Sequence, residues 1–192
     1  MTRNQWIAVV ALAGGAVLVL SQVVQGCKPI IQGAGKRILL VGDSLAVGMS
    51  KPFLASAQAQ GHVAQVNAKV STTMSHWLGQ GGLAGIVAAF QPDVVLVCLG
   101  TNDSKTNYTD AQLTEHVQRI LATAGATGAK VGWILPPRLP FPDRVGPIVR
   151  ATGGPAFESA TLDGLQQADG IHPSGAGFAK WNEAVWAWAT CA

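Results

Sequence analysis

The chain has 192 residues, of which 48% are hydrophobic and 12% are charged, and its formal net charge is +3. This composition excludes an intrinsically disordered chain, and the length suits one domain with a sizeable core. The thirteen basic residues form no run, which argues against a nucleic-acid-binding protein. The three cysteines lie too far apart in the sequence to indicate a zinc site.

The N-terminal segment, residues 1–26, is predicted to direct export or to anchor the chain in a membrane as an apolar helix. Residues Trp6 to Leu20 carry no charge, Arg3 precedes them, and a signal-peptide cleavage point fits before Cys27. Cys27 could then carry a lipid. A retained anchor is the alternative, because Trp6 to Val24 is just long enough to cross a bilayer. We expect an extracytoplasmic protein that contacts a membrane only through an uncleaved or lipidated segment.

Residues 27–35 are predicted to form a linker, since they contain Pro29, Gly33 and Gly35, and residues 36–192 are predicted to form the domain. The first element of that domain is the apolar run Ile38 to Val41, which is typical of a buried strand in a parallel sheet.

The chain then turns at Gly42-Asp43-Ser44 and enters a helix predicted over residues 46–60. Ser44 therefore lies at the carboxyl end of a strand, where open α/β sheets bind their ligands. It also lies near a helix N-terminus, which favours developing negative charge. Ser44 is thus a candidate nucleophile, and Asp43 is interpreted as the residue that forms the turn by accepting a backbone hydrogen bond.

The rest of the chain alternates between apolar strands and helical patterns. Further strands are predicted at 62–70, 94–99, 130–135 and 157–162, and helices at 74–90, 109–123 and from 174 onward. This alternation predicts an α/β fold, a three-layer α/β/α sandwich around a parallel sheet of about five strands. Residues 138–155 are rich in proline, glycine and arginine and are interpreted as a long connection of the kind that is functional or disordered.

Two further polar groups follow these elements. Asn102, in the stretch Gly100-Thr101-Asn102-Asp103, ends an apolar strand, and its amide could donate to an oxyanion. Asp169 and His172 lie three residues apart around Gly170, so both side chains can point to one site from a tight turn. A base held by a carboxylate is what an attacking serine hydroxyl needs.

The motifs Gly-Asp-Ser-Leu at 42–45, Gly-x-Asn-Asp at 100–103 and Asp-x-x-His at 169–172 occur in this order, and the chain resembles the GDSL-type, or SGNH, esterases and lipases from residue 36 onward. The resemblance implies a flavodoxin-like SGNH hydrolase fold and a serine esterase that needs no cofactor and no metal. It implies Ser44 as nucleophile, His172 as general base and then acid, and Asp169 as the residue that orients His172.

The resemblance also implies an oxyanion hole built from the Ser44 N–H group, the Asn102 amide with Gly100 beside it, and a backbone N–H group after the second strand. The family usually has a glycine in that last block, whereas this chain has Ser71-Thr72-Thr73. We align Ser71 with the glycine, which is a departure from the family pattern. A helix cap is an equally good interpretation of Ser71 and Thr72.

The expected substrate is a carboxylic ester, with a short acyl or acetyl group on a polar or carbohydrate alcohol, because no apolar insertion could build a deep acyl channel. An acyltransferase with the same triad and a non-catalytic, membrane-tethered protein on a decayed scaffold are the alternatives. Trp77 and Trp133 are interpreted as core residues or as the wall of a pocket. Arg138, Arg144 and Arg150 are interpreted as solvated surface residues or as contacts to an anionic substrate. The other histidines, His62, His76 and His116, are interpreted as surface or packing residues.

Overall fold

The computed structural model describes residues 28–165 and 169–192, so the apolar helix predicted within residues 1–26 lies outside the described residues. The centre of the fold is a five-stranded sheet with the order β2-β1-β3-β4-β5, and all four pairs of neighbouring strands are parallel. The strands are β1 (Arg37–Gly42), β2 (Val63–Ala68), β3 (Val94–Cys98), β4 (Lys130–Ile134) and β5 (Ala156–Phe157). This strand order is that of flavodoxin-like folds, as the sequence predicts.

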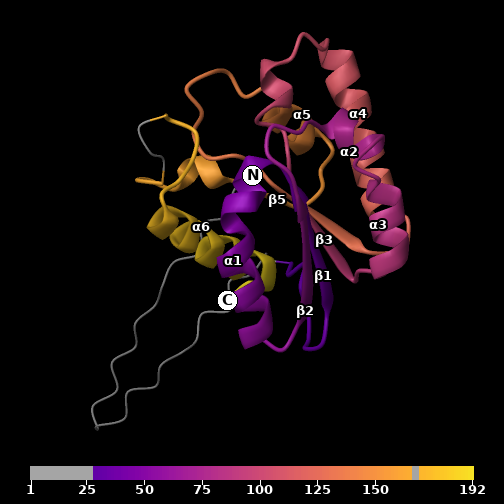
Figure 1. Cartoon of the computed structure of the whole chain (residues 1–192), viewed down its shortest axis with the longest axis vertical. Helices are drawn as coiled ribbons and strands as arrows, with labels where there is room; N and C mark the ends of the chain where they lie inside the picture. The colour runs from indigo at the N-terminus through magenta and orange to yellow at the C-terminus, as the bar shows by residue number, and fades with distance from the viewer. Residues whose placement is uncertain (1–27, 166–168) are drawn as a thin grey trace, which may run out of the picture.

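Helices cover both faces of the sheet and complete the predicted three-layer sandwich (Figure 1). One face carries α1 (Ser44–Ala59) and α6 (Gly175–Thr190). The other carries α2 (Met74–Leu78), α3 (Leu83–Phe90), α4 (Asp110–Ala124) and α5 (Val145–Ala151). Two short 3-10 turns, η1 (Asp103–Lys105) and η2 (Ser159–Thr161), follow β3 and β5.

The apolar run of β1 explains why the sheet is buried on both faces. Successive side chains of a strand point to opposite sides, so Ile38 and Leu40 pack in the core beneath α1 and α6. Leu39 and Val41 pack in the core beneath α2 to α5. All four side chains are fully buried. A continuous apolar run is therefore what this central strand requires.

Three predicted elements differ from those observed. The helix expected over 74–90 is two helices, because glycines at 79, 81 and 82 interrupt it and Gly82 has a left-handed φ of +63°. The last predicted strand is only two residues long and is followed by η2. The connection 138–155 contains α5, because Val145 and Val149 give it an apolar side that is buried in the core.

Part of the predicted linker packs onto the domain. Ile30 and Ile31 are 4% exposed and belong to the core beneath α1 and α6. Their backbone N–H groups both donate to the carbonyl oxygen of Ala189, near the end of α6, at 2.9 Å. Within residues 28–165 and 169–192, no helix is long and apolar enough to cross a bilayer.

Candidate active site

The sequence-predicted site residues come together at the carboxyl ends of the central strands. β1 leads into Asp43 and Ser44, and β3 leads into the stretch Gly100 to Asp103. The chain passes from β1 to β2 on one side and returns to β3 on the other, so the ends of β1 and β3 form the switch point at which open α/β sheets bind their ligands. The ends of β1 and β3 approach each other closely at Gly42, because a Cβ atom at this position would lie 2.4 Å from the carbonyl oxygen of Cys98.

Ser44, His172 and Asp169 form a continuous hydrogen-bonded chain. The Oγ atom of Ser44 lies 2.9 Å from Nε2 of His172. The Nδ1 atom of His172 lies 2.7 Å from Oδ2 of Asp169. The His172 ring therefore has a carboxylate on one nitrogen and the serine hydroxyl on the other, which is the arrangement of a nucleophile, a base and an orienting acid.

The turn between Asp169 and His172 fixes both side chains. Gly170 adopts a left-handed φ of +70°, which a residue with a Cβ atom rarely tolerates. The Oδ1 atom of Asp169 accepts hydrogen bonds from the N–H groups of Ile171 and His172, both at 2.9 Å. The hydrogen bond from His172, together with these two backbone bonds, lowers the pKa of Asp169 to about 2. Asp169 therefore stays charged at the pH values at which it must orient His172.

Asn102 links the ends of three strands. Its Nδ2 atom donates to the carbonyl oxygen of Thr72 at 2.9 Å and lies 3.5 Å from Oδ2 of Asp43. Ser71, which is expected to match the family glycine, is exposed and has a φ of +59°. The structure thus brings the neighbouring Thr72, rather than Ser71, into contact with Asn102. Gly100 has a φ of +124° and packs against Val145 of α5.

Comparisons with known proteins agree with this geometry. The model of the GDSL-like lipase/acylhydrolase family matches residues 40–161, which include Ser44 and Asn102 and end before Asp169. The chain belongs to this family.

Two kinds of relatives support the assignment. Esterase TesA from Pseudomonas aeruginosa is 30% identical over 84% of this chain and 93% of its own length. The lipase/acylhydrolase from Enterococcus faecalis has the same fold, with a TM-score of 0.65 and 22% identity over 79% of this chain and 93% of that one. A catalytic mutant of Axe2, an acetylxylan esterase from Geobacillus stearothermophilus, aligns with a TM-score of 0.67 and 16% identity over 82% and 95%. This GDSL-like protein is therefore an enzyme, a serine hydrolase of the esterase/acylhydrolase type.

Two buried carboxyl groups hold the turns around Ser44 and Asn102 in this GDSL-like hydrolase. Asp43 is fully buried and caps α1, because its Oδ1 atom accepts the N–H group of Leu45 at 2.9 Å, which confirms its predicted turn-forming role. Asp103 is also fully buried and accepts the N–H group of Met74 on both oxygens, at 3.0 and 3.2 Å. Asp103 thus caps α2 from a distant part of the chain, since the N-cap residue Thr73 makes no such bond.

Burial changes the charge state of both groups. Loss of hydration, with a smaller effect of the nearby Asp103, raises the pKa of Asp43 to about 7, although the hydrogen bond from the Leu45 N–H group opposes this. Burial also raises the pKa of Asp103 to about 6, although the hydrogen bond from Met74 opposes this. The carboxyl groups of Asp43 and Asp103 are therefore only partly charged near neutral pH.

Most of the other residues for which the sequence leaves a functional role open pack in the core or hold loops in place. Trp77 and Trp133 are core residues, at 5% and 1% exposure. Arg144 donates to the carbonyl oxygens of Thr106 and Tyr108, so it holds a loop. Arg150 forms an ion pair with Glu158.

The three other histidines each pack against an aromatic ring: His62 against Trp186, His116 against Tyr108 and His76 against Trp77. Cys98 is a free thiol, and burial raises its pKa.

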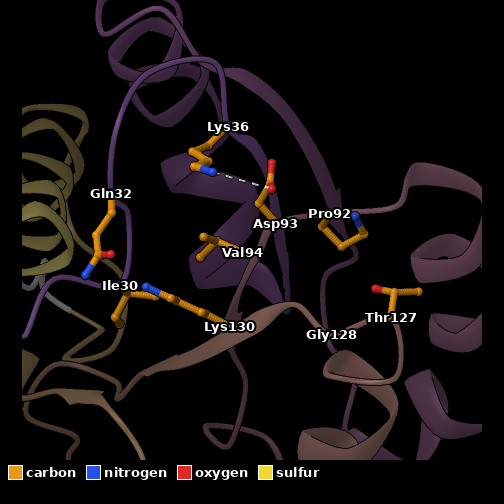
Figure 2. Close-up of a pocket in the computed structure, with 9 residues that line it drawn as sticks. All are labelled: Ile30, Gln32, Lys36, Pro92, Asp93, Val94, Thr127, Gly128 and Lys130. Atoms are coloured by element: carbon orange, nitrogen blue, oxygen red, sulfur yellow. Dashed lines mark ion pairs between the residues drawn. The ribbon is translucent and has the colours of Figure 1, made fainter.

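A hollow of about 370 Å³ lies at the other end of the sheet (Figure 2). Its wall includes residues next to the amino ends of β1, β3 and β4, namely Lys36, Asp93 and Lys130, together with Ile30, Gln32, Pro92, Val94, Thr127 and Gly128. Lys36 and Asp93 form an ion pair of 3.7 Å across it. None of the triad residues reaches this hollow, so it is separate from the catalytic centre.

Proposed function

We propose that this enzyme hydrolyses carboxylic esters through an acyl-enzyme on Ser44. The observation that carries the proposal is the hydrogen-bonded chain from Ser44 through His172 to Asp169. The Ser44 hydroxyl gives its proton to Nε2 of His172 while its oxygen bonds to the ester carbonyl carbon. The carbonyl oxygen becomes an oxyanion, which the Ser44 N–H group, the Asn102 amide and a backbone N–H group of the turn 71–73 stabilise.

The tetrahedral intermediate then collapses. The bond to the alcohol oxygen breaks, and the protonated His172 gives its proton to the leaving alcohol, so the acyl group stays on Ser44. Water attacks the acyl-enzyme in the same way, with His172 again as the base, and the carboxylic acid leaves. Asp169 orients the imidazole throughout and stabilises its charged form.

The openness of the site supports short acyl groups on a polar or carbohydrate alcohol. The side chains of His172 and Asp169 are 38% and 51% exposed. A site this open offers little apolar surface to a long acyl chain, whereas a large polar alcohol can approach it freely. The same openness admits an acceptor alcohol in place of water, which is how an acyltransferase would use this triad.

Labelling tests the mechanism. A fluorophosphonate should modify Ser44, as identified by peptide mapping, and Ser44→Ala and His172→Ala should each lower ester hydrolysis by a similar large factor because the residues act as a unit. Ser50→Ala is the matched control on the same helix, since the Ser50 hydroxyl only bonds the carbonyl of Ala46. Full activity in Ser44→Ala would refute the proposal. Transfer of acetyl to added sugar in preference to water would instead identify an acyltransferase.

We further propose that the protein is exported. The chain carries the charge-free segment Trp6 to Leu20, and Cys191 is disulfide-bonded. Disulfides form and persist in oxidising compartments and are rare in the cytosol. Cys98 is a free, buried thiol, so Cys27, which lies outside the described residues, is the remaining cysteine that the chain itself could supply to Cys191.

A further inference from the structure

The segment Pro140-Phe141 lies between two parts of the active site. A Cβ atom on Gly170, in the turn that carries the catalytic acid and base, would lie 3.4 Å from Cγ of Pro140, so Pro140 packs beside that turn. The next residue, Phe141, contacts Lys105, whose Nζ atom lies 5.3 Å from the centroid of the ring in a cation–π contact. Lys105 follows Asn102 by three residues. The segment therefore connects the catalytic turn with the stretch that carries the Asn102 amide.

Lys105 is exposed, although the backbone on both sides of it is held in place. The neighbouring Ser104 accepts the backbone N–H group of Arg144 on its Oγ atom at 3.1 Å. The carbonyl oxygens of Thr106 and Tyr108 accept the Arg144 guanidinium at 3.1 and 2.6 Å. The stretch after β3 and the connection 138–155 thus fix each other, and together they determine where the Lys105 side chain lies.

The ammonium of Lys105 has no ion-pair partner within residues 28–165 and 169–192. The rest of the chain contains no aspartate or glutamate. The nearby acidic residues are engaged elsewhere: Asp110 pairs with Arg144, Asp143 accepts two backbone N–H groups at the start of α5, and Asp169 bonds to the imidazole of the triad. A positive charge that an anionic ligand could neutralise therefore lies beside the site.

This charge acts at the turn that carries the nucleophile. Burial raises the pKa of Asp43, and the Lys105 ammonium opposes that rise, so the two groups are close enough to interact. Among the arginines that the sequence offers as contacts to an anionic substrate, Arg144 and Arg150 are bonded to other groups of the protein. Lys105 is better placed for that role, and the half-buried Phe141 ring gives it a flat apolar surface for the carbon skeleton of a ligand.

We propose that Lys105 and Phe141 bind the alcohol part of the substrate, and that this alcohol is anionic, with a carboxylate or a phosphate near the ester bond. The inference rests on the proposed function and narrows its substrate class. His172 gives its proton to the leaving alcohol, so that alcohol lies next to the turn against which Pro140 packs. The anion pairs with the ammonium, and the ring contacts the carbon atoms beside the anion.

Two matched pairs of acetyl esters test the proposal on the full chain. One pair is the acetate of methyl glucuronoside and that of methyl glucoside, and the other is the acetate of glycerol 3-phosphate and that of glycerol. Release of acetate measures kcat/KM for each ester. We expect the anionic member of at least one pair to be preferred roughly twofold to fivefold, the value of one exposed ion pair. The pair that shows the preference distinguishes a carboxylate from a phosphate, and no preference in either pair would overturn the proposal.

Substitutions at Lys105 test which residue reads the charge. Lys105→Gln should abolish the preference and Lys105→Glu should reverse it, because a carboxylate repels the anion that an ammonium attracts. The change should lie in KM, since the anion is bound equally before and during the reaction. Lys130→Gln is the matched control and should keep the wild-type preference, because Lys130 is also exposed but begins β4 at the other end of the sheet. An unchanged preference in Lys105→Gln would refute the assignment.

Two further measurements complete the test. Phe141→Leu removes the flat ring and should raise KM for both sugar acetates, and an unchanged KM would exclude Phe141 from the subsite. Hydrolysis of p-nitrophenyl acetate, which carries no anion, separates this inference from the proposed function. If the wild type hydrolyses it but shows no preference for charge, only the subsite is refuted. If the wild type does not hydrolyse it, the proposed function itself is refuted.

Discussion

Asp43 lies directly before the nucleophile, and its carboxyl group is fully buried at the end of β1. It caps α1 through the N–H group of Leu45, and its Oδ2 atom lies 3.5 Å from the Asn102 amide, so it contacts both the turn at Ser44 and the stretch after β3. Burial raises its pKa to about 7, which means that the folded protein binds this proton more tightly than the unfolded chain does. Its protonation therefore stabilises the fold at acidic pH.

This linkage predicts a pH dependence of stability. The contribution of Asp43 is fully present below its unfolded pKa of about 3.8 and is lost as the pH rises through about 7. Between pH 5 and pH 8, the wild type should therefore lose roughly 2–3 kcal/mol of its free energy of unfolding relative to Asp43→Asn. Asp103, with a pKa raised to about 6, adds a similar slope that both proteins share.

Urea unfolding of both proteins at pH 5, 6, 7 and 8 measures this difference. Burial lowers the pKa values of His62 and His116, so their contribution to the free energy of unfolding rises with pH, opposite to that of Asp43. Both proteins contain these histidines, so their contribution drops out of the difference. Asp163→Asn, at an exposed position, should follow the wild-type curve. A constant difference between Asp43→Asn and wild type across this range would contradict the assignment.

At the scale of elements, the helix α5 packs most of the large apolar side chains of the connection 138–155 against the core, which leaves little apolar surface for a substrate. The connection 138–155 has few large apolar residues, and Val145, Ile148 and Val149 are among them. In the structure, Val145 and Val149 are buried in the core beneath α2 to α5, and Ile148 packs against it. The side chains of Val145 and Val149 therefore stabilise the domain and are not available to line an acyl channel.

Substrate preference should follow from this. With p-nitrophenyl esters of rising acyl length, kcat/KM of the full chain should peak at acetyl or butyryl and decline for longer chains, because an open site buries few additional methylene groups. Steady-state kinetics at substrate concentrations below micelle formation measures the profile. A maximum at octanoyl or longer chains would show that an apolar groove forms when substrate binds.

At the scale of the whole molecule, the first described residues and the last helix are joined. Ile30 and Ile31 are bonded to Ala189, two residues before the disulfide-bonded Cys191. The first described residues therefore lie beside the end of α6. Ser44 and Asn102 lie elsewhere, where the chain leaves the carboxyl ends of β1 and β3.

The export proposal predicts the chemistry of Cys191. Peptide mapping of the non-reduced protein, produced by secretion, should recover Cys191 in a disulfide with Cys27. Cys191→Ser should lower the free energy of unfolding by about 2–4 kcal/mol, and a reductant should bring wild type to the same value while leaving the variant unchanged. A free Cys191 thiol, or a lipid on Cys27, would contradict this pairing.

The sequence by itself determined the features that arise within short stretches. The apolar run 38–41 and the turn that follows place Ser44 at a strand end, because periodicity and turn chemistry act over a few residues. The same holds for the turn from Asp169 to His172, where Gly170 supplies the conformation that both side chains need. Once these units are recognised, the order of strands and helices limits the fold to a sandwich around a parallel sheet.

Only the tertiary structure decided what depends on partners distant in the sequence. Whether Ser71 or Thr72 meets Asn102 depends on a left-handed turn residue and on an amide thirty residues downstream, and no local pattern fixes either. The helix within 138–155 forms because Val145 and Val149 find a core to pack against, which overrides the helix-breaking composition of that connection. The partial charge of Asp43 likewise follows from burial beneath other elements, a property that the identity of the residue alone cannot reveal.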